Sequence, residues 1–230
     1  MVQAVILAGG KGTRLRPLTN NLPKPMIPVQ GKPFLEHLII FLKQQGFKKF
    51  LILSGYRAEQ IENYFKDGKT FGLKIKYSRE KKLLGTAGAL KKAARLLAKE
   101  FILFNGDTLL SIDYRKFIAA FKAAKKMAMV TAYRNKGNFA KSNLLLCGNQ
   151  VTAYSRSETK DKTHVDSGAT ALSKKVLDLI PVGKVCSLED EVYPQLIARG
   201  ELAVFVTPKR FYDMGSFEGL KALDEAGRLR

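Results

Sequence analysis

The first 132 residues alternate short apolar runs with segments of helical length, and this alternation limits the folds open to the chain. The apolar runs are four to six residues long, the length of buried strands, and they span 4–7, 50–53, 101–104 and 127–132. Apolar residues at helical spacing predict helices that begin at Pro33 and that span 58–65 and 87–98. This order predicts an α/β fold with a mostly parallel sheet flanked by helices, whose ligands bind beyond the carboxyl ends of the strands.

The sequence changes in character after about residue 133. Strand candidates crowd together with few helix signals, at 143–146, 151–154 and 165–172. They predict a small β-rich insertion on the substrate side of the sheet. Ser187 followed by Asp190 is typical of a helix N-terminus, and 203–206 predicts a last strand.

A chain of 230 residues is long enough for one sizeable core. We therefore expect one domain. Its predicted parts are a first part at about 1–132, a second at about 133–215 and a C-terminal helix at 216–230.

A glycine-rich loop follows the first predicted strand, with the residues Gly9, Gly10, Lys11, Gly12, Thr13 and Arg14. It does not fit the Walker spacing, and the dinucleotide spacing G-x-G-x-x-G fails because its last position is Leu15. A tight turn explains one or two glycines but not three with cations beside them. Backbone N–H groups of such a loop turn toward a phosphate chain, and Lys24, between two prolines, is a cation on a stiff segment.

The formal charge of +20 suggests a polyanionic partner. However, Lys and Arg never exceed two in a row, and most of them lie on the polar side of predicted helices. Charged residues are seldom buried without partners, so solvated faces explain the excess. We expect neither a nucleic-acid nor a membrane partner.

Cysteine and histidine usage argues against a structural metal site. Cys147 and Cys186 lack a C-x-x-C spacing, and His37 and His164 have no ligand pattern beside them. Apolar stretches such as 38–42 are too short to span a bilayer. The sequence therefore predicts a cytoplasmic, reduced protein.

Four ordered motifs resemble the signature of the sugar-1-phosphate nucleotidylyltransferases. They span 7–15 with 23–26, then 84–90, 105–107 and 213–216. The resemblance implies a Rossmann-like, GT-A-like fold, with the nucleotide bound by the first part and the sugar by the second. It also implies the reaction: an oxygen of a sugar 1-phosphate attacks the α-phosphorus of a nucleoside triphosphate, which gives a nucleotide sugar and pyrophosphate.

The resemblance also implies roles for individual residues. Arg14 and Lys24 are the catalytic cations, and Asp107 and Asp213 hold Mg²⁺, although Asp107 by itself is also typical of an Asx turn. The implied nucleotide-binding residues are Leu7, Ala8, Gly9, Gly10, Lys11, Gly12, Thr13, Arg14, Gly85 and Thr86. The implied sugar-phosphate-binding residues are Lys24, Asn105, Gly106, Arg156, Asp166 and Gly168. For Lys11, an exposed position without function fits the sequence equally well.

The sequence departs from the family pattern on the sugar side. Arg156 stands where members often carry a Glu-Lys pair, which indicates an anionic or differently hydroxylated sugar, with Glu158 as an alternative contact. Compact members with similar motifs at 84–89 and 186–191 are guanylyltransferases for heptose 1-phosphate or mannose 1-phosphate. A uridylyltransferase acting on glucose 1-phosphate or an amino-sugar 1-phosphate stays open, as do a silent nucleotide-sensing module and a homo-oligomer.

Overall fold

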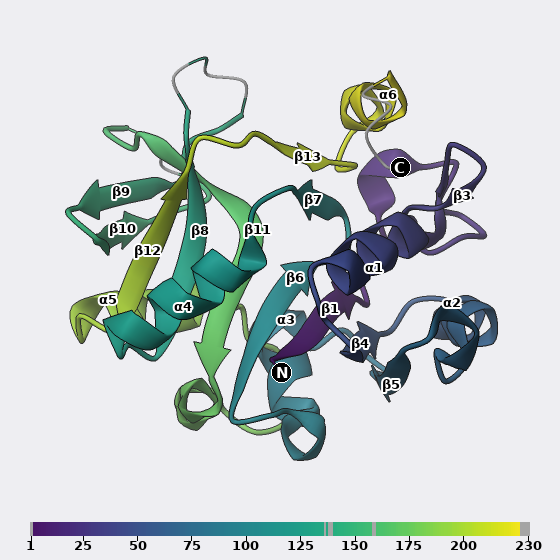
Figure 1. Cartoon of the computed structure of the whole chain (residues 1–230), viewed down its shortest axis with the longest axis horizontal. Helices are drawn as coiled ribbons and strands as arrows, with labels where there is room; N and C mark the ends of the chain where they lie inside the picture. Colours follow the sequence, from purple (N-terminus) through teal and green to yellow (C-terminus); the bar gives the residue numbers. More distant parts are fainter. Residues whose placement is uncertain (1, 136, 138–139, 158–159, 226–230) are drawn as a thin grey trace. The chain divides into compact units, whose positions relative to one another are not determined.

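The computed structural model describes residues 2–135, 137, 140–157 and 160–225 (Figure 1). Glu158 and the last residues of the predicted C-terminal helix lie outside the described residues. The chain divides into two compact units. The first unit consists of Met1–Leu83, Phe104–Leu109 and Tyr212–Arg230, and the second of Leu84–Leu103 and Leu110–Phe211. The predicted division near residue 132, with the nucleotide bound before it and the sugar bound after it, stays a prediction.

Parallel strands organise the first unit, where β4 lies between β1 and β5 (Figure 1). Ala8 pairs with Ser54, and Ser54 pairs with Arg79, so the three strands end at one edge of the sheet. The elements of this unit are β1 (Gln3–Ala8), β2 (Pro28–Val29), β3 (Lys32–Pro33), α1 (Phe34–Gln44), β4 (Lys49–Ser54), α2 (Ala58–Phe65), β5 (Lys74–Arg79) and α6 (Phe217–Glu225).

The pattern of apolar residues explains most of the strands and helices of the first unit. Ala4, Val5 and Ile6 of β1 are fully buried, as a central parallel strand requires, and α1 follows Pro33 as predicted. Strand β5 was not predicted. Its Lys74 and Lys76 are exposed on either side of the buried Ile75, which is the alternation of an edge strand rather than an apolar run.

The second unit contains a mixed run of strands in the order β6-β11-β8-β12-β10-β9. Strand β12 pairs with β8 in parallel, whereas β11 pairs with β8, and β10 with both β12 and β9, in antiparallel fashion. The elements are α3 (Gly85–Lys92), β6 (Glu100–Asn105), α4 (Tyr114–Ala124), β8 (Ala128–Arg134), β9 (Leu144–Cys147), β10 (Gln150–Tyr154), β11 (His164–Ser173), α5 (Tyr193–Ala198) and β12 (Leu202–Thr207). The predicted β-rich insertion is therefore present. The paired strands β7 (Thr108–Leu110) and β13 (Phe211–Asp213), like β6, have residues in both units.

Several helices differ from the prediction. The segment predicted as one helix at 87–98 forms α3 and then a separate 3-10 turn at Ala94–Leu96. Helix α4 was not predicted, although Asp113 caps it by accepting from the backbone N–H groups of Arg115 and Lys116. Ser187 caps a π-helical turn, Leu188–Val192, that leads into α5.

Within the described part of the chain, we find no helix with the length and apolar character that crossing a membrane requires. Cys147 is exposed and Cys186 is buried, and both are free thiols.

Candidate active site

The glycine-rich loop adopts a conformation that requires glycine. Gly12 has a φ of 62°, in the left-handed region, and a Cβ placed on it would lie 2.9 Å from the Cβ of Lys24. The loop is fixed on both sides, because the Thr19 hydroxyl donates to the Gly12 carbonyl at 2.9 Å and Leu15 is fully buried. Gly10, Lys11, Thr13 and Arg14 remain exposed around it. The loop therefore lies directly against Lys24 and presents its backbone and cations outward.

Lys24 forms an ion pair with Asp107, across 83 positions of sequence. Its side chain is only 11% exposed, whereas that of Asp107 is 34% exposed. The second carboxylate oxygen of Asp107, Oδ1, accepts from the Thr108 hydroxyl at 3.0 Å. A cation buried to this degree depends on its partner, because removing one member of such a pair leaves an uncompensated charge.

Gly106 brings Asp107 to the end of β1. Its N–H donates to the Leu7 carbonyl at 2.9 Å, and a Cβ on Gly106 would lie only 2.3 Å from that oxygen. No side chain fits there, so the residue that precedes Asp107 must be glycine. Asn105 is half-buried just before it, and Ala8 is buried at the end of β1.

Asp213 reaches the same site from the far end of the chain. The Met214 N–H donates to the Asp107 carbonyl at 2.9 Å, and the Asp213 Oδ1 accepts from the Gly215 N–H at 2.7 Å. A Cβ on Gly215 would lie 2.6 Å from Asp213 Oδ1 and 3.9 Å from Arg14 Nη1. Ser216 then caps α6, its Oγ accepting from the Gly219 N–H at 3.1 Å. Arg14, Lys24, Asp107 and Asp213 thus converge within the first unit.

The two carboxylates suit Mg²⁺. Among the described residues, no three His, Cys, Asp or Glu side chains gather in a way that could hold a metal ion by themselves. Mg²⁺ is commonly held by one or two carboxylates, with substrate phosphates as further ligands, rather than by an all-protein cage. Asp107 and Asp213 fit that pattern beside the glycine-rich loop.

Glu80 is a candidate functional residue that sequence reasoning missed. It follows β5 at the edge where β1 and β4 also end, and its N–H donates to the Ser54 carbonyl at 2.8 Å. Its carboxylate lies over the start of the glycine-rich loop: a Cβ on Gly9 would be 2.6 Å from Glu80 Oε1. A cavity of about 410 Å³ opens here, lined by Lys11, Gly55, Tyr56, Glu80, Lys81, Lys82 and Leu83.

The second unit fixes Gly85 and Thr86 at the start of α3. Gly85 has a φ of 75°, and a Cβ on it would lie 2.4 Å from the Cys186 carbonyl. The Thr86 hydroxyl donates to Glu189 at 2.7 Å and accepts from the Leu188 N–H at 2.7 Å. Because this hydroxyl already has two partners, it holds the π-helical turn in place. Its predicted contact with the base stays a prediction.

Arg156 does not present a free charge. Its guanidinium pairs with Glu189 at 3.0 Å and with Asp190 at 3.7 Å, and Glu189 is 9% exposed. Ser187 joins this group, its hydroxyl lying 3.0 Å from the Glu189 carboxylate and 2.8 Å from that of Asp190. The acidic side chains outnumber the single guanidinium, which weakens the hypothesis of an anionic sugar.

The pKa of the Asp166 carboxyl group is raised. Burial raises its pKa to about 7, and the negative charge of Glu189 adds to this, whereas the Gly168 N–H and the charge of Arg156 lower it. The Gly168 N–H donates to Asp166 Oδ1 at 3.0 Å, with Gly168 at a φ of 89°. Asp166, Gly168 and Arg156 are thus placed in the second unit, and their contact with a sugar phosphate stays a prediction.

We expect Asp166→Asn to stabilise the protein at high pH. Between about pH 4 and pH 7 the folded protein holds a proton at Asp166 that the unfolded chain has lost, so stability falls as pH rises, by about 1.4 kcal/mol per pH unit. The amide removes this loss and still accepts from the Gly168 N–H. Urea unfolding should show a gain of at least about 2 kcal/mol at about pH 8 and little gain at about pH 4.

Asp178→Asn is the matched control for this variant, because Asp178 is exposed in the same unit. It should leave the free energy of unfolding unchanged at both pH values. Equal stability of wild type and Asp166→Asn at about pH 8 would contradict the raised pKa.

Comparison with known proteins identifies the family. The family model described as nucleotidyl transferase matches residues 3–142. The D-glycero-alpha-D-manno-heptose 1-phosphate guanylyltransferase of Campylobacter jejuni is 34% identical over 203 residues, which cover 86% of this chain and 89% of that protein. The mannose-1-phosphate guanylyltransferase of Mycobacterium tuberculosis is 32% identical over 94% of this chain, but the chain spans only 62% of its length.

A solved structure matches along almost the whole chain. The crystal structure of HddC from Yersinia pseudotuberculosis complexed with GMP-PN has a TM-score of 0.83 and 30% identity, and the match covers 98% of this chain and 99% of HddC. This confirms the predicted nucleotidyltransferase fold, including its β-rich second part. Because the family model spans more than half of the chain, over the glycine-rich loop and Asp107, this protein belongs to the nucleotidyl transferase family.

Proposed function

We propose that the protein is a guanylyltransferase that transfers GMP from GTP to D-glycero-D-manno-heptose 1-phosphate or mannose 1-phosphate. The products are a GDP-sugar and pyrophosphate. The observation that carries this proposal is the convergence of Arg14, Lys24, Asp107 and Asp213 beside a glycine-rich loop. The named relatives act on these two sugar phosphates.

Positioning and charge stabilisation account for this reaction, since phosphoryl transfer leaves little covalent work to the protein. Arg14 contacts the departing β- and γ-phosphates, and Lys24 bridges the α-phosphate and the sugar phosphate. Asp107 and Asp213 hold Mg²⁺, which supplies Lewis-acid stabilisation of the phosphate oxygens. The backbone N–H groups of the glycine-rich loop bind the phosphate chain and orient it for attack.

Glu80 favours guanine among the bases. An ionised carboxylate only accepts hydrogen bonds, and its two oxygens suit a pair of adjacent donors. The Watson–Crick edge of guanine offers such a pair, the ring N1–H and the 2-amino group, whereas uracil offers one N–H between two carbonyls that a carboxylate repels. Because the carboxylate lies over Gly9 in the cavity at the strand edge, we assign it to the base.

The second unit favours a neutral sugar. Arg156 is paired with Glu189 and Asp190, and Asp166 adds a further acidic group. Carboxylates accept hydrogen bonds from sugar hydroxyl groups, whereas they repel a carboxylated sugar. Mannose and heptose, which carry only hydroxyl groups, match this environment.

A pyrophosphate-release panel tests the function. Purified protein with Mg²⁺ is assayed with GTP, UTP, CTP and dTTP against the 1-phosphates of mannose, glucose, N-acetylglucosamine and D-glycero-D-manno-heptose. We expect the strongest signal with GTP and heptose or mannose 1-phosphate. A UTP signal with glucose 1-phosphate supports the uridylyltransferase instead. Silence in every combination supports either a sugar outside the panel or a nucleotide-sensing module.

Glu80→Gln sharpens the assignment of the base. Loss of the charged acceptor should lower kcat/KM for GTP by about 10- to 100-fold and change the weak UTP signal much less. Glu59→Gln, an exposed carboxylate of the same unit, is the matched control and should leave the GTP preference intact. If Glu80→Gln lowers both triphosphates equally, Glu80 does not select the base.

A further inference from the structure

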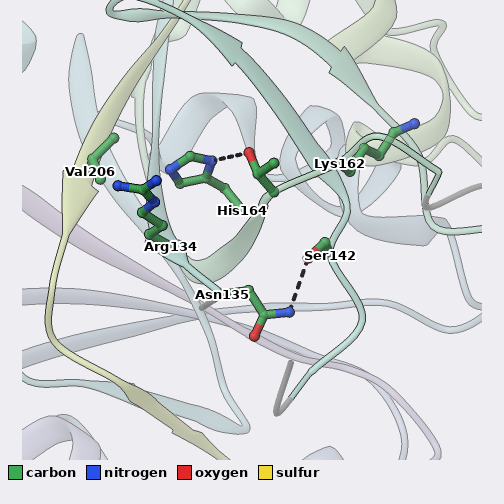
Figure 2. A pocket seen from close by; sticks show the side chains of 7 residues that line it. Arg134, Asn135, Ser142, Lys162, His164 and Val206 are labelled. Carbon is green, nitrogen blue, oxygen red and sulfur yellow. Dashed lines mark hydrogen bonds between the residues drawn. The ribbon is translucent and has the colours of Figure 1, made fainter. Parts of the chain in front are cut away.

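The second unit contains a pocket of about 480 Å³ whose cations do not converge. The structure describes all of its lining residues, which include Arg134 and Lys162. Figure 2 shows Lys162 pointing away from Arg134, and the Asn135 amide nitrogen already donates to Ser142 Oγ at 3.0 Å. Small-molecule sites are formed by polar groups that converge on the ligand. We therefore assign no ligand to this pocket.

In the first unit, hydrogen bonds from the start of α2 hold the segment that joins the glycine-rich loop to Lys24. This segment, 16–21, forms turns rather than a helix or a strand. All of its residues are exposed except Thr19, which is 1% exposed. An exposed segment with so little burial is mobile unless other elements hold it. Its order therefore depends on the contacts that α2 provides.

Tyr56 contacts the chain on both sides of the glycine-rich loop. Its backbone N–H donates to the Gly9 carbonyl, at the start of the loop, at 3.1 Å. Its hydroxyl oxygen lies 2.6 Å from the Asn20 carbonyl and 3.1 Å from the Thr19 carbonyl. A phenol carries a single proton, so this hydroxyl donates mainly to the nearer carbonyl. One residue thus ties together the two points between which the loop runs.

Arg57 and Gln60 extend this contact along α2. The Gln60 amide nitrogen donates to the Asn21 carbonyl at 2.8 Å, and Arg57 Nη2 donates to Asn21 Oδ1 at 3.1 Å. Arg57 has a φ of 52°, which costs free energy in a residue other than glycine and persists where surrounding contacts impose it. Its guanidinium also lies 5.8 Å from the centre of the Tyr56 ring. We call Tyr56, Arg57 and Gln60 the clasp.

Thr19 connects the clasp to the glycine-rich loop and to Lys24. Its hydroxyl donates to the Gly12 carbonyl at 2.9 Å. A Cβ placed on Gly12 would lie 3.0 Å from Thr19 Cγ2 and 2.9 Å from Lys24 Cβ. The loop therefore packs against both Thr19 and Lys24, and fixing residues 19–21 fixes the loop in turn.

We propose that Tyr56, Arg57 and Gln60 are positioning residues, which hold the glycine-rich loop and Lys24 in the conformation that binds a triphosphate chain. This inference rests on the proposed function, in which the loop and Lys24 bind the phosphates. A site that is ordered before binding loses less conformational freedom when the ligand arrives, and this raises affinity. Loss of the clasp therefore weakens triphosphate binding without removing any group that contacts the phosphates.

Amide hydrogen exchange in the full chain, measured by NMR, tests whether the clasp holds the loop. The N–H groups of Leu15 and Asn20 donate at 3.0 Å to the carbonyls of Gly12 and Pro17. Tyr56→Phe removes only the hydroxyl, and it should speed exchange at both amides at least about threefold. Unchanged exchange at both amides overturns the clasp. This measurement needs no substrate, so its result does not depend on the proposed function.

Tyr77→Phe is the matched control. Tyr77 is also half-buried in the first unit, and its hydroxyl donates to the Lys66 carbonyl at 2.6 Å. This variant loses the same kind of bond, so the urea midpoint should shift by a similar amount. Exchange at Leu15 and Asn20 should stay at the wild-type rate. Equal acceleration by both variants would show a general loss of stability and overturn a specific role for Tyr56.

Calorimetry with Mg²⁺ and inorganic tripolyphosphate, which carries no base, tests the effect on binding. Tyr56→Phe should raise the Kd about tenfold, and Tyr77→Phe should not. Thr19→Val removes the hydroxyl that reaches Gly12, so its loss and that of Tyr56→Phe should not multiply in the double variant. Losses that multiply, or an unchanged Kd in Tyr56→Phe, overturn the positioning role.

The wild-type protein separates this inference from the proposed function. If it binds neither GTP nor tripolyphosphate, the proposed function fails together with the role of the clasp in triphosphate binding. If it binds both and Tyr56→Phe binds them equally well, only the positioning role fails.

Discussion

Asp107→Asn should lower the kcat for nucleotidyl transfer by at least about 10³-fold while the fold stays intact. The side chains have nearly the same shape, and the amide oxygen still accepts from the Thr108 hydroxyl. The variant loses the charge that we propose binds Mg²⁺ and that neutralises Lys24. The measurement is pyrophosphate release as a function of Mg²⁺ concentration, with thermal unfolding as the check on folding.

Asp67→Asn is the matched control, since Asp67 is an exposed carboxylate of the same unit whose cation partner is the exposed Lys69. It should retain the full rate. An Asp107→Asn protein that turns over within about threefold of the wild type would remove Asp107 from the metal site.

Lys24→Met should lower kcat by about 10²- to 10³-fold, because the transition state loses a cation that is fixed at 11% exposure between two prolines. Methionine keeps the unbranched side chain as far as Cε, so packing of its Cβ and Cγ against Gly12 should survive. The variant also leaves Asp107 without a cation. We therefore expect the Mg²⁺ concentration that gives half of the maximal rate to fall, which an effect on folding alone would not produce.

Lys48→Met, an exposed lysine of the same unit, controls for the loss of charge and should change neither quantity. If Lys24→Met lowered kcat but raised the half-saturating Mg²⁺ concentration, Lys24 would help to shape the metal site rather than act on the phosphates.

Much of the fold could be predicted from the residue types of neighbouring positions in the sequence. The apolar residues 4–7 form a buried strand because a parallel strand covered on both faces has no polar side. Gly12 is required by its own φ, and Ser187 and Ser216 cap the turns that follow them. These features depend on neighbours in sequence, so the sequence contains the information that specifies them. Strand β5 escaped prediction because its alternation of lysines with a single buried isoleucine is typical of many exposed segments.

The sequence by itself determined the glycine-rich loop, the strands that carry it and the four charged residues of the proposed transfer site. Only the tertiary structure decided how charges are paired. It joined Lys24 to Asp107, placed the carboxylate of Glu80 over Gly9 through the register of parallel strands, and neutralised Arg156 with the acidic π-helical turn. Register and ion pairing arise from contacts between residues far apart in the chain, and residue types alone do not encode which distant partner is within a few ångströms.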